Sequence, residues 1–383
     1  EATGLAATTE DPPGGVVHRD ADGRPTGLCG EAAASLLLSG VPLPEWEAFE
    51  SATDRVVARL ASQGITAVSG ICQTGDVGPS GAAGAMEADA WAALLDRVPF
   101  DVQTILVTAD PADLLVRRDG PLHRPAAGRR LDAVKVFLDC TLGGHTACMH
   151  HPFADRDVTG MLTTPEQDAY ATMAAAHLAG LQVCVHAIGD RANRVAVDLF
   201  DRLLAEHPDP DHRHRVEHAS VLDEATVDDF ARLGLTAVVQ PVSIGSERAW
   251  LAKRLGPDRI GRVYPFRSLL DAGAVVAGSS DAPIESTDVL EAMRCATDRR
   301  GVAAEQAITP AEALAMYTSG AAWARRSETV CGTLAPGRRA DLAVLSQDPM
   351  SALERTEVVA TVVAGEVVFG ADALAGAREG GQR

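Results

Sequence analysis

Short apolar runs rich in β-branched residues recur along the chain, and segments with the period of an amphipathic helix separate them. Such runs are expected where both faces of a strand are buried, and their alternation with helices is typical of a parallel α/β sheet. A doubly wound sheet and a (β/α)8 TIM barrel both fit, but no G-x-G-x-x-G motif follows the first run, so a dinucleotide-binding sheet loses support. The barrel would be one strand short, because the chain has seven such runs: 65–68, 102–107, 133–138, 181–186, 215–219, 235–240 and 274–277.

Helical segments are predicted around these strands, and two of them begin with Thr followed by Pro, at Thr164 and Thr309. This pair is typical of an N-cap and a first-turn proline. The predicted helices are 46–60, 164–179, 190–206, 222–233 and 309–324. After about residue 327, turn signals and short strands at 340–345, 358–363 and 366–369 predict a small β segment with a hairpin turn at Ala364-Gly365. We therefore predict a barrel domain over 1–326 and a β segment with a frayed tail over 327–383.

The charge of the chain argues against two classes of partner. It carries 53 acidic and 34 basic residues, a net charge of −19, whereas nucleic acids and anionic membranes are bound by basic surfaces. Seven scattered cysteines with no C-x-x-C spacing indicate reduced thiols, as in cytoplasmic proteins. We expect a cytoplasmic protein with a small-molecule substrate, no nucleic acid and no membrane.

Polar side chains that could carry chemistry lie at the ends of four predicted strands. Lys135 lies in the third run, His186 ends the fourth and His218 lies in the fifth, while Asp281 follows the seventh. A single histidine at a strand end is more often structural, and a lone lysine is more often salt-bridged. Because the carboxyl ends of parallel barrel strands share one rim, we nevertheless expect these four to converge. Imidazoles and carboxylates are zinc ligands, and a lysine becomes one only as a carbamate.

Other candidate residues are weighed against structural roles. His145 follows the third strand within a Gly-Gly-His-Thr turn, where the backbone can approach a ligand closely, so substrate contact is one interpretation. The pair His212 and His214 has ligand spacing but precedes its strand, at the wrong rim. Strand alternation predicts that Glu217 points away from His218 and forms a structural ion pair.

Several of these segments together resemble the amidohydrolase superfamily, and within it the YtcJ-like branch that includes N-substituted formamide deformylases. The similarity runs from about residue 5 to 370. It is carried by V-K-V-F-L-D at 134–139, H-A-I-G-D at 186–190, R-H-R-V-E-H at 213–218, Q-P at 240–241, G-S-S-D-A-P at 278–283 and G-T-L-A-P-G-R-R-A-D-L at 332–342.

The resemblance implies a metal-dependent (β/α)8 hydrolase that cleaves carbon–nitrogen bonds of amide or formamide type, other than peptide bonds. It implies a carbamylated Lys135 that bridges divalent metals, with zinc expected, and His186 and His218 as further ligands. Asp281 would be both a ligand and the catalytic residue that relays a proton from a metal-activated water. It also implies that residues 327–383 include the carboxyl-terminal half of a composite β-sandwich.

The same resemblance implies that Asp190 and Arg215 lie next to the metal ligands without binding the metal themselves. The family also places an H-x-H pair on a first strand, upstream of anything in this chain, so a barrel that lacks strand 1 is expected. We therefore expect this chain by itself to bind one metal weakly, or none, and to be a poor catalyst. The exposed sheet edges would need a partner, and a homo-oligomer is one possibility.

Two other functions remain open at the level of sequence. A catalytically incomplete barrel would act as a regulatory or binding protein, and an upstream H-x-H in the reading frame would argue against it. A deaminase of the same superfamily is the other. Deaminases usually lack the strand lysine, so Lys135 argues against this alternative.

Overall fold

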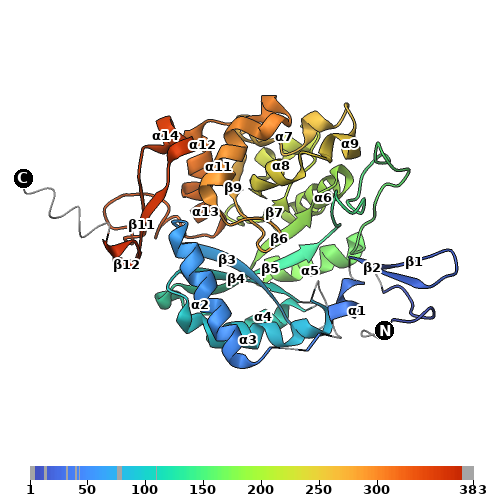
Figure 1. Cartoon of the computed structure of the whole chain (residues 1–383), viewed down its shortest axis with the longest axis horizontal. Coiled ribbons are helices and arrows are strands. Elements are labelled where there is room, and N and C mark those ends of the chain that lie inside the picture. The colour runs from blue at the N-terminus through green and yellow to red at the C-terminus, as the bar shows by residue number, and fades with distance from the viewer. Residues whose placement is uncertain are drawn as a thin grey trace, which may run out of the picture.

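The computed structural model describes residues 5–12, 15–31, 33–38, 41–42, 44–75, 80–108 and 110–372. Three sheets are present in these ranges: an antiparallel hairpin of β1 (Gly15–Arg19) and β2 (Pro25–Glu31), a seven-stranded parallel sheet, and an antiparallel three-stranded sheet near the C-terminus. The hairpin and the three-stranded sheet lie at opposite ends of the molecule, with the parallel sheet between them (Figure 1).

The seven predicted strands form one parallel sheet in sequence order. Every strand therefore neighbours the next one along the chain, as βαβ units require. Among the described residues β3 and β9 each pair on one side only, so the curled sheet remains open between them. The strands are β3 (Ala67–Gln73), β4 (Asp101–Val107), β5 (Arg129–Phe137), β6 (Gln182–Ala187), β7 (Arg215–His218), β8 (Thr236–Val239) and β9 (Val275–Gly278).

Helices pack along the outer face of this sheet and connect its strands (Figure 1). The described helices are α1 (Ala34–Leu38), α2 (Trp46–Ser62), α3 (Glu87–Leu94), α4 (Pro111–Arg117), α5 (Glu166–Leu178), α6 (Asp190–Glu206), α7 (Glu224–Leu233), α8 (Val242–Glu247), α9 (Leu251–Leu255), α10 (Phe266–Asp271), α11 (Val289–Asp298), α12 (Pro310–Tyr317), α13 (Ser319–Ala324) and α14 (Pro349–Ala352). None of the helices in the described ranges combines the length and the apolarity that crossing a bilayer demands.

Some predicted boundaries were wrong for local reasons. The segment 309–324 is two helices, because Thr318 adopts φ −119° and ψ −92° between α12 and α13. Thr309 does cap α12, in a capping box with Glu312, whereas Thr164 caps nothing and Pro165 precedes α5 instead. The strand predicted at 65–68 is β3, which is longer than predicted because it continues to Gln73 in register with β4.

The two faces of the central strands differ in chemistry. On the outer face, valines of β5, β6 and β7 join the main hydrophobic core beneath the helices: Val134, Val136, Val183, Val185 and Val216. The alternate positions are also buried, and beside the small apolar cluster that includes Cys184 they carry charged side chains: Lys135, Arg215 and Glu217. Because alternate residues of a strand face opposite sides, these polar residues line the concave inner face of the sheet.

The carboxyl-terminal segment forms the predicted small sheet of β10 (Leu342–Leu345), β11 (Val358–Val363) and β12 (Glu366–Phe369). Ala364 and Gly365 connect β11 to β12 with φ values of 51° and 89°, so the predicted hairpin turn is confirmed. The sheet contacts α2, where the Thr361 hydroxyl donates to the Ala61 carbonyl at 2.6 Å. The predicted tail begins beyond the described residues.

Candidate metal centre

Three of the four predicted ligands lie on adjacent strands and converge on the inner face of the sheet. Lys135 lies in β5, His186 in β6 and His218 at the end of β7. The rings of His186 and His218 are 4.3 Å apart between centroids. Burial lowers the pKa of both histidines, and the charge on Lys135 lowers them further. The lysine and both imidazoles therefore share one buried region.

The backbone at the end of β7 explains how His218 reaches this region. His218 has φ 76°, a left-handed conformation that is rare for a residue with a side chain. Without this kink, strand alternation would place His218 on the side opposite Glu217. The prediction that the two point apart was therefore wrong, since His218 packs against the ring of His186 on the same inner face as Glu217. Backbone strain of this kind concentrates at functional sites.

The hydrogen bonds of the two histidines leave one nitrogen of each ring available. His218 Nδ1 lies 2.8 Å from the Gln240 side-chain oxygen and donates to it, which leaves the Nε2 lone pair free. His186 Nε2 lies 3.3 Å from the carbonyl oxygen of Cys140 and donates there, which leaves the lone pair on Nδ1. A neutral imidazole whose other nitrogen donates to an oxygen is the usual form of a metal ligand.

Lys135 is 5% exposed, and burial lowers the pKa of its ammonium group. In the described part of the chain, its Nζ has neither a hydrogen bond nor an ion pair, and it lies 5.2 Å from the centroid of the Phe137 ring. Amines react with CO2 only when neutral, and the lowered pKa favours the neutral amine of Lys135. The donor chemistry of this region therefore fits a divalent cation held by two imidazoles and a carbamylated lysine.

Arg215 and Glu217 form a buried ion pair on the same inner face as Lys135. The Arg215 Nε lies 2.6 Å from Glu217 Oε1, and Arg215 also donates to the carbonyl of Ala324 at 3.1 Å. Burial raises the pKa of Glu217, but Arg215 and Lys135 outweigh it and the pKa is lowered. The predicted structural ion pair of Glu217 is therefore present, and the charge of Arg215 also lowers the pKa of Lys135 directly.

Asp281 lies beyond the end of β9, with φ 53° and a half-buried side chain. Its negative charge raises the pKa of both Lys135 and His218, although burial has the larger and opposite effect on each. Within the described ranges no three His, Cys, Asp or Glu side chains are close enough to hold one ion. Asp281 thus lies within electrostatic range of Lys135 and His218, but among the described residues it does not complete a three-residue ligand group with the two histidines.

The remaining predicted residues have other partners. His145 Nε2 lies 2.9 Å from Asp155 Oδ1, and Asp155 also pairs with Arg254, so His145 stabilises the β5–α5 loop, residues 138–165. Asp190 accepts the backbone N–H of His150 at 2.8 Å and has no hydrogen bond to His186 or His218 in the described chain. Both residues therefore hold loops at the rim where the strands end.

One site residue was missed by the sequence analysis. Asp139 lies two residues beyond the end of β5, and its side chain is completely buried, with Oδ1 3.5 Å from His186 Nε2. Burial raises its pKa to about 7, although backbone N–H groups of Gly189, Cys148 and Ile188 lower it. In the sequence, an aspartate directly after the apolar run 133–138 is the signal that indicates such a residue.

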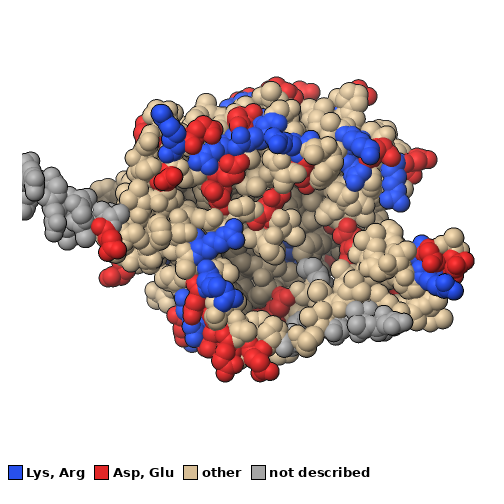
Figure 2. All heavy atoms as spheres, in the orientation of Figure 1, with Lys and Arg blue, Asp and Glu red and all other residues tan. Residues whose placement is uncertain are grey.

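Figure 2 shows the face of Figure 1 as a surface, hollowed near its centre between the half that carries α2 and α3 and the half that carries α7 to α9. Acidic side chains are visible within the hollow, and basic side chains gather mainly along its rims. The hollow gives this face of the molecule a concave shape suited to a small ligand.

The predicted decoy, His212 with His214, belongs to a buried histidine cluster at the start of β7. His214 accepts a backbone N–H from β6 on Nδ1, so its Nε2 donates to His177 Nδ1 at 2.8 Å, and His177 Nε2 donates to the His207 carbonyl. His212 Nδ1 accepts the His214 N–H, and its Nε2 donates to the Leu233 carbonyl. Every ring nitrogen is used in a neutral tautomer, so the pair is structural.

This cluster predicts a loss of stability in acid. Burial lowers the pKa of His214 and His212, and Arg326 and His177 lower both further, while Asp209 opposes them at His212. Because the folded pKa lies below the unfolded value of about 6.5, the unfolded chain takes up protons first. The contribution is complete above about pH 6.5 and is lost as the pH falls.

The measurement is the difference in unfolding free energy between the wild type and a His214→Phe variant, from urea titrations between pH 8 and 5. We expect the advantage of the wild type to shrink as the pH falls. His151→Phe, at an exposed side chain, is the control and should give a constant difference. A difference for His214→Phe that is constant or grows in acid would contradict the tautomer assignment.

Comparison with known proteins places these observations in a family. The model described as "Amidohydrolase family" matches residues 1–369. YtcJ of Bacillus subtilis (strain 168), named as a candidate amidohydrolase, is 30% identical over 387 residues, which are 96% of this chain and 70% of YtcJ. The N-substituted formamide deformylase of Arthrobacter pascens is 27% identical over 95% of this chain and 69% of its own length.

Solved structures show the same fold. A metal-dependent hydrolase from Pyrococcus horikoshii OT3 matches with a TM-score of 0.71 and 25% identity, over 88% of this chain and 67% of that one. Atrazine chlorohydrolase TrzN from Arthrobacter aurescens TC1, complexed with zinc, matches with a TM-score of 0.58 and 17% identity, over 85% and 72%. The predicted α/β barrel of metal-dependent hydrolase type is thereby confirmed, in a chain that spans about two thirds of these relatives. Because the family match covers nearly all of the sequence, the protein belongs to the amidohydrolase family.

Proposed function

We propose that this member of the family is a metal-dependent hydrolase of carbon–nitrogen bonds in small amides or formamides, other than peptide bonds. The observation that carries the proposal is the pair of free lone pairs, Nδ1 of His186 and Nε2 of His218, beside the buried amine of Lys135. The similarity to an N-substituted formamide deformylase supports the bond type.

In this proposal His186, His218 and a carbamylated Lys135 hold a divalent cation, with zinc as the expected metal. The cation would polarise the carbonyl and lower the pKa of a water to near 7. Asp281 accepts the proton of the attacking water and returns it to the leaving nitrogen, for which a half-buried carboxylate near His218 is suited. Arg215 and Glu217 lie beside Lys135, and because they form an ion pair their opposite charges cancel.

The test is formate or amine release from an N-alkylformamide and from a cyclic amide. It uses this chain as isolated and the longest natural reading frame that contains it, after chelation and after addition of zinc with bicarbonate. We expect zinc-dependent hydrolysis that a chelator abolishes. Metal-independent hydrolysis, or none by either protein, would count against the proposal and leave a binding protein as the alternative.

A further inference from the structure

Asp139 is a buried carboxylate whose partners are unusual. Its side chain is fully enclosed, yet in the described chain neither an arginine nor a lysine lies within ion-pair distance. The ion-pair partner within reach is the imidazole of His186, which is neutral, and its Nε2 is 3.5 Å from Oδ1. Burying a carboxylate without a counter-ion costs free energy. A buried carboxylate of this kind is therefore a candidate for a functional role.

The same carboxylate joins two loops at the rim of the sheet. Its Oδ2 accepts the N–H groups of Cys148 and Gly189 at 2.9 and 2.8 Å, and its Oδ1 accepts that of Ile188 at 3.0 Å. The loops touch closely, since a Cβ on Gly189 would lie 2.0 Å from the Cys148 carbonyl oxygen. Asp139 therefore ties the β5–α5 loop to the turn that directly follows His186.

Both acceptors that face His186 Nε2 come from this junction. The Cys140 carbonyl lies 3.3 Å from Nε2, and the Asp139 carboxylate lies behind it at 3.5 Å. A carboxylate and a carbonyl oxygen on one side of an imidazole stabilise the tautomer with hydrogen on that nitrogen, which leaves the lone pair on Nδ1. The ring is thus fixed in both orientation and tautomer.

We propose that Asp139 is the positioning residue of the site: it holds His186 as the Nε2–H tautomer with Nδ1 presented to the metal, and anchors the loop above it. This inference rests on the proposed function in that it assigns a metal to Nδ1. The placement of Nδ1 itself does not depend on whether a metal binds.

The first test is the tautomer in the metal-free protein. The full chain carrying 15N-labelled histidine is studied at pH 8, and the His186 signals are assigned by their loss in His186→Gln. We expect the Nε2–H form of His186 in the wild type, and a mixture of tautomers in Asp139→Asn. A wild type in the Nδ1–H form overturns the proposal, even if the variant fails to fold.

The second test is affinity for zinc alone, by competition with a chromogenic chelator in bicarbonate buffer. Asp139→Asn should weaken binding by about 10- to 100-fold, the usual effect of removing a carboxylate behind a histidine ligand. The matched control is Asp190→Asn, which removes another buried carboxylate that anchors the same loop through His150 but does not face His186.

The outcomes separate the two proposals. An unchanged tautomer and unchanged zinc affinity in a folded Asp139→Asn overturn the positioning role, as does an equal loss in Asp190→Asn. If the wild type binds no zinc while the tautomer still depends on Asp139, then the metal-dependent function fails and the positioning of His186 stands.

Discussion

Replacement of Lys135 by alanine is expected to abolish zinc-dependent hydrolysis, with a loss of at least about 10³-fold in kcat/KM. In the proposed centre this side chain would be the third donor beside His186 and His218, and no other Asp, Glu, Cys or His in the described chain completes a three-residue group with these histidines. Zinc affinity should fall in parallel. The measurement is turnover and zinc binding for the longest natural reading frame, with and without bicarbonate.

The chain offers a matched control, because it has only one other lysine, Lys253, which is exposed on α9. Lys253→Ala should leave turnover, zinc affinity and the dependence on bicarbonate unchanged. If Lys135→Ala retains turnover, the carbamate has no place in the mechanism. If both variants lose activity equally, the effect is not specific to the inner face.

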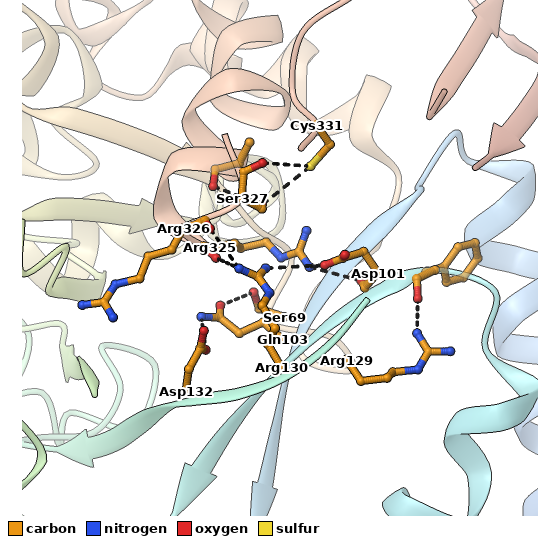
Figure 3. A network of polar contacts seen from close by, with 12 residues as sticks. Ser69, Asp101, Gln103, Arg129, Arg130, Asp132, Arg325, Arg326, Ser327 and Cys331 are labelled. Carbon is orange, nitrogen blue, oxygen red and sulfur yellow. Dashed lines mark hydrogen bonds and ion pairs between the residues drawn. The ribbon is translucent and has the colours of Figure 1, made fainter. Parts of the chain in front are cut away.

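Replacement of Asp101 by asparagine is expected to give the largest loss of stability, about 3 to 5 kcal/mol in unfolding free energy. Asp101 begins β4 at the end of the sheet away from the candidate site, where it lies beside Arg325 and Arg130 (Figure 3). It also pairs with the guanidinium group of Arg339. Burial would raise the pKa of Asp101, but the three arginines outweigh it and lower the pKa.

The neutral side chain would leave Arg325 buried without its counter-ion. Arg325 follows α13, so the network joins the first half of the sheet to the last helices of the barrel (Figure 3). Urea unfolding measures the effect. Asp54→Asn, at an exposed ion pair with Arg97, is the control and should change stability by less than about 1 kcal/mol. A loss of the same size in both variants would contradict the importance of the network.

The strands and the inner face were predictable because their signals are local. Alternation along β5 and β6 assigns Lys135 and His186 to the concave side, and the parallel order of the strands brings them together. The capping box at Thr309 and the hairpin at Ala364-Gly365 are likewise set by neighbouring residues.

Other features depend on contacts that no local pattern reveals. The turn of His218 to the inner face requires a left-handed backbone, which alternation cannot anticipate. The role of Asp139 depends on backbone N–H groups from residues 148, 188 and 189, which only the folded loops bring together. The break between α12 and α13 arises at Thr318, which is itself neither proline nor glycine.

The most direct test of the proposed centre is to locate the metal itself. Crystals of the chain grown with zinc and bicarbonate would be measured on both sides of the zinc absorption edge. We predict an anomalous peak bounded by His186 Nδ1, His218 Nε2 and a carbamylated Lys135, with Asp281 facing it. Zinc bound only elsewhere, with Lys135 an unmodified amine, would contradict the proposed metal centre.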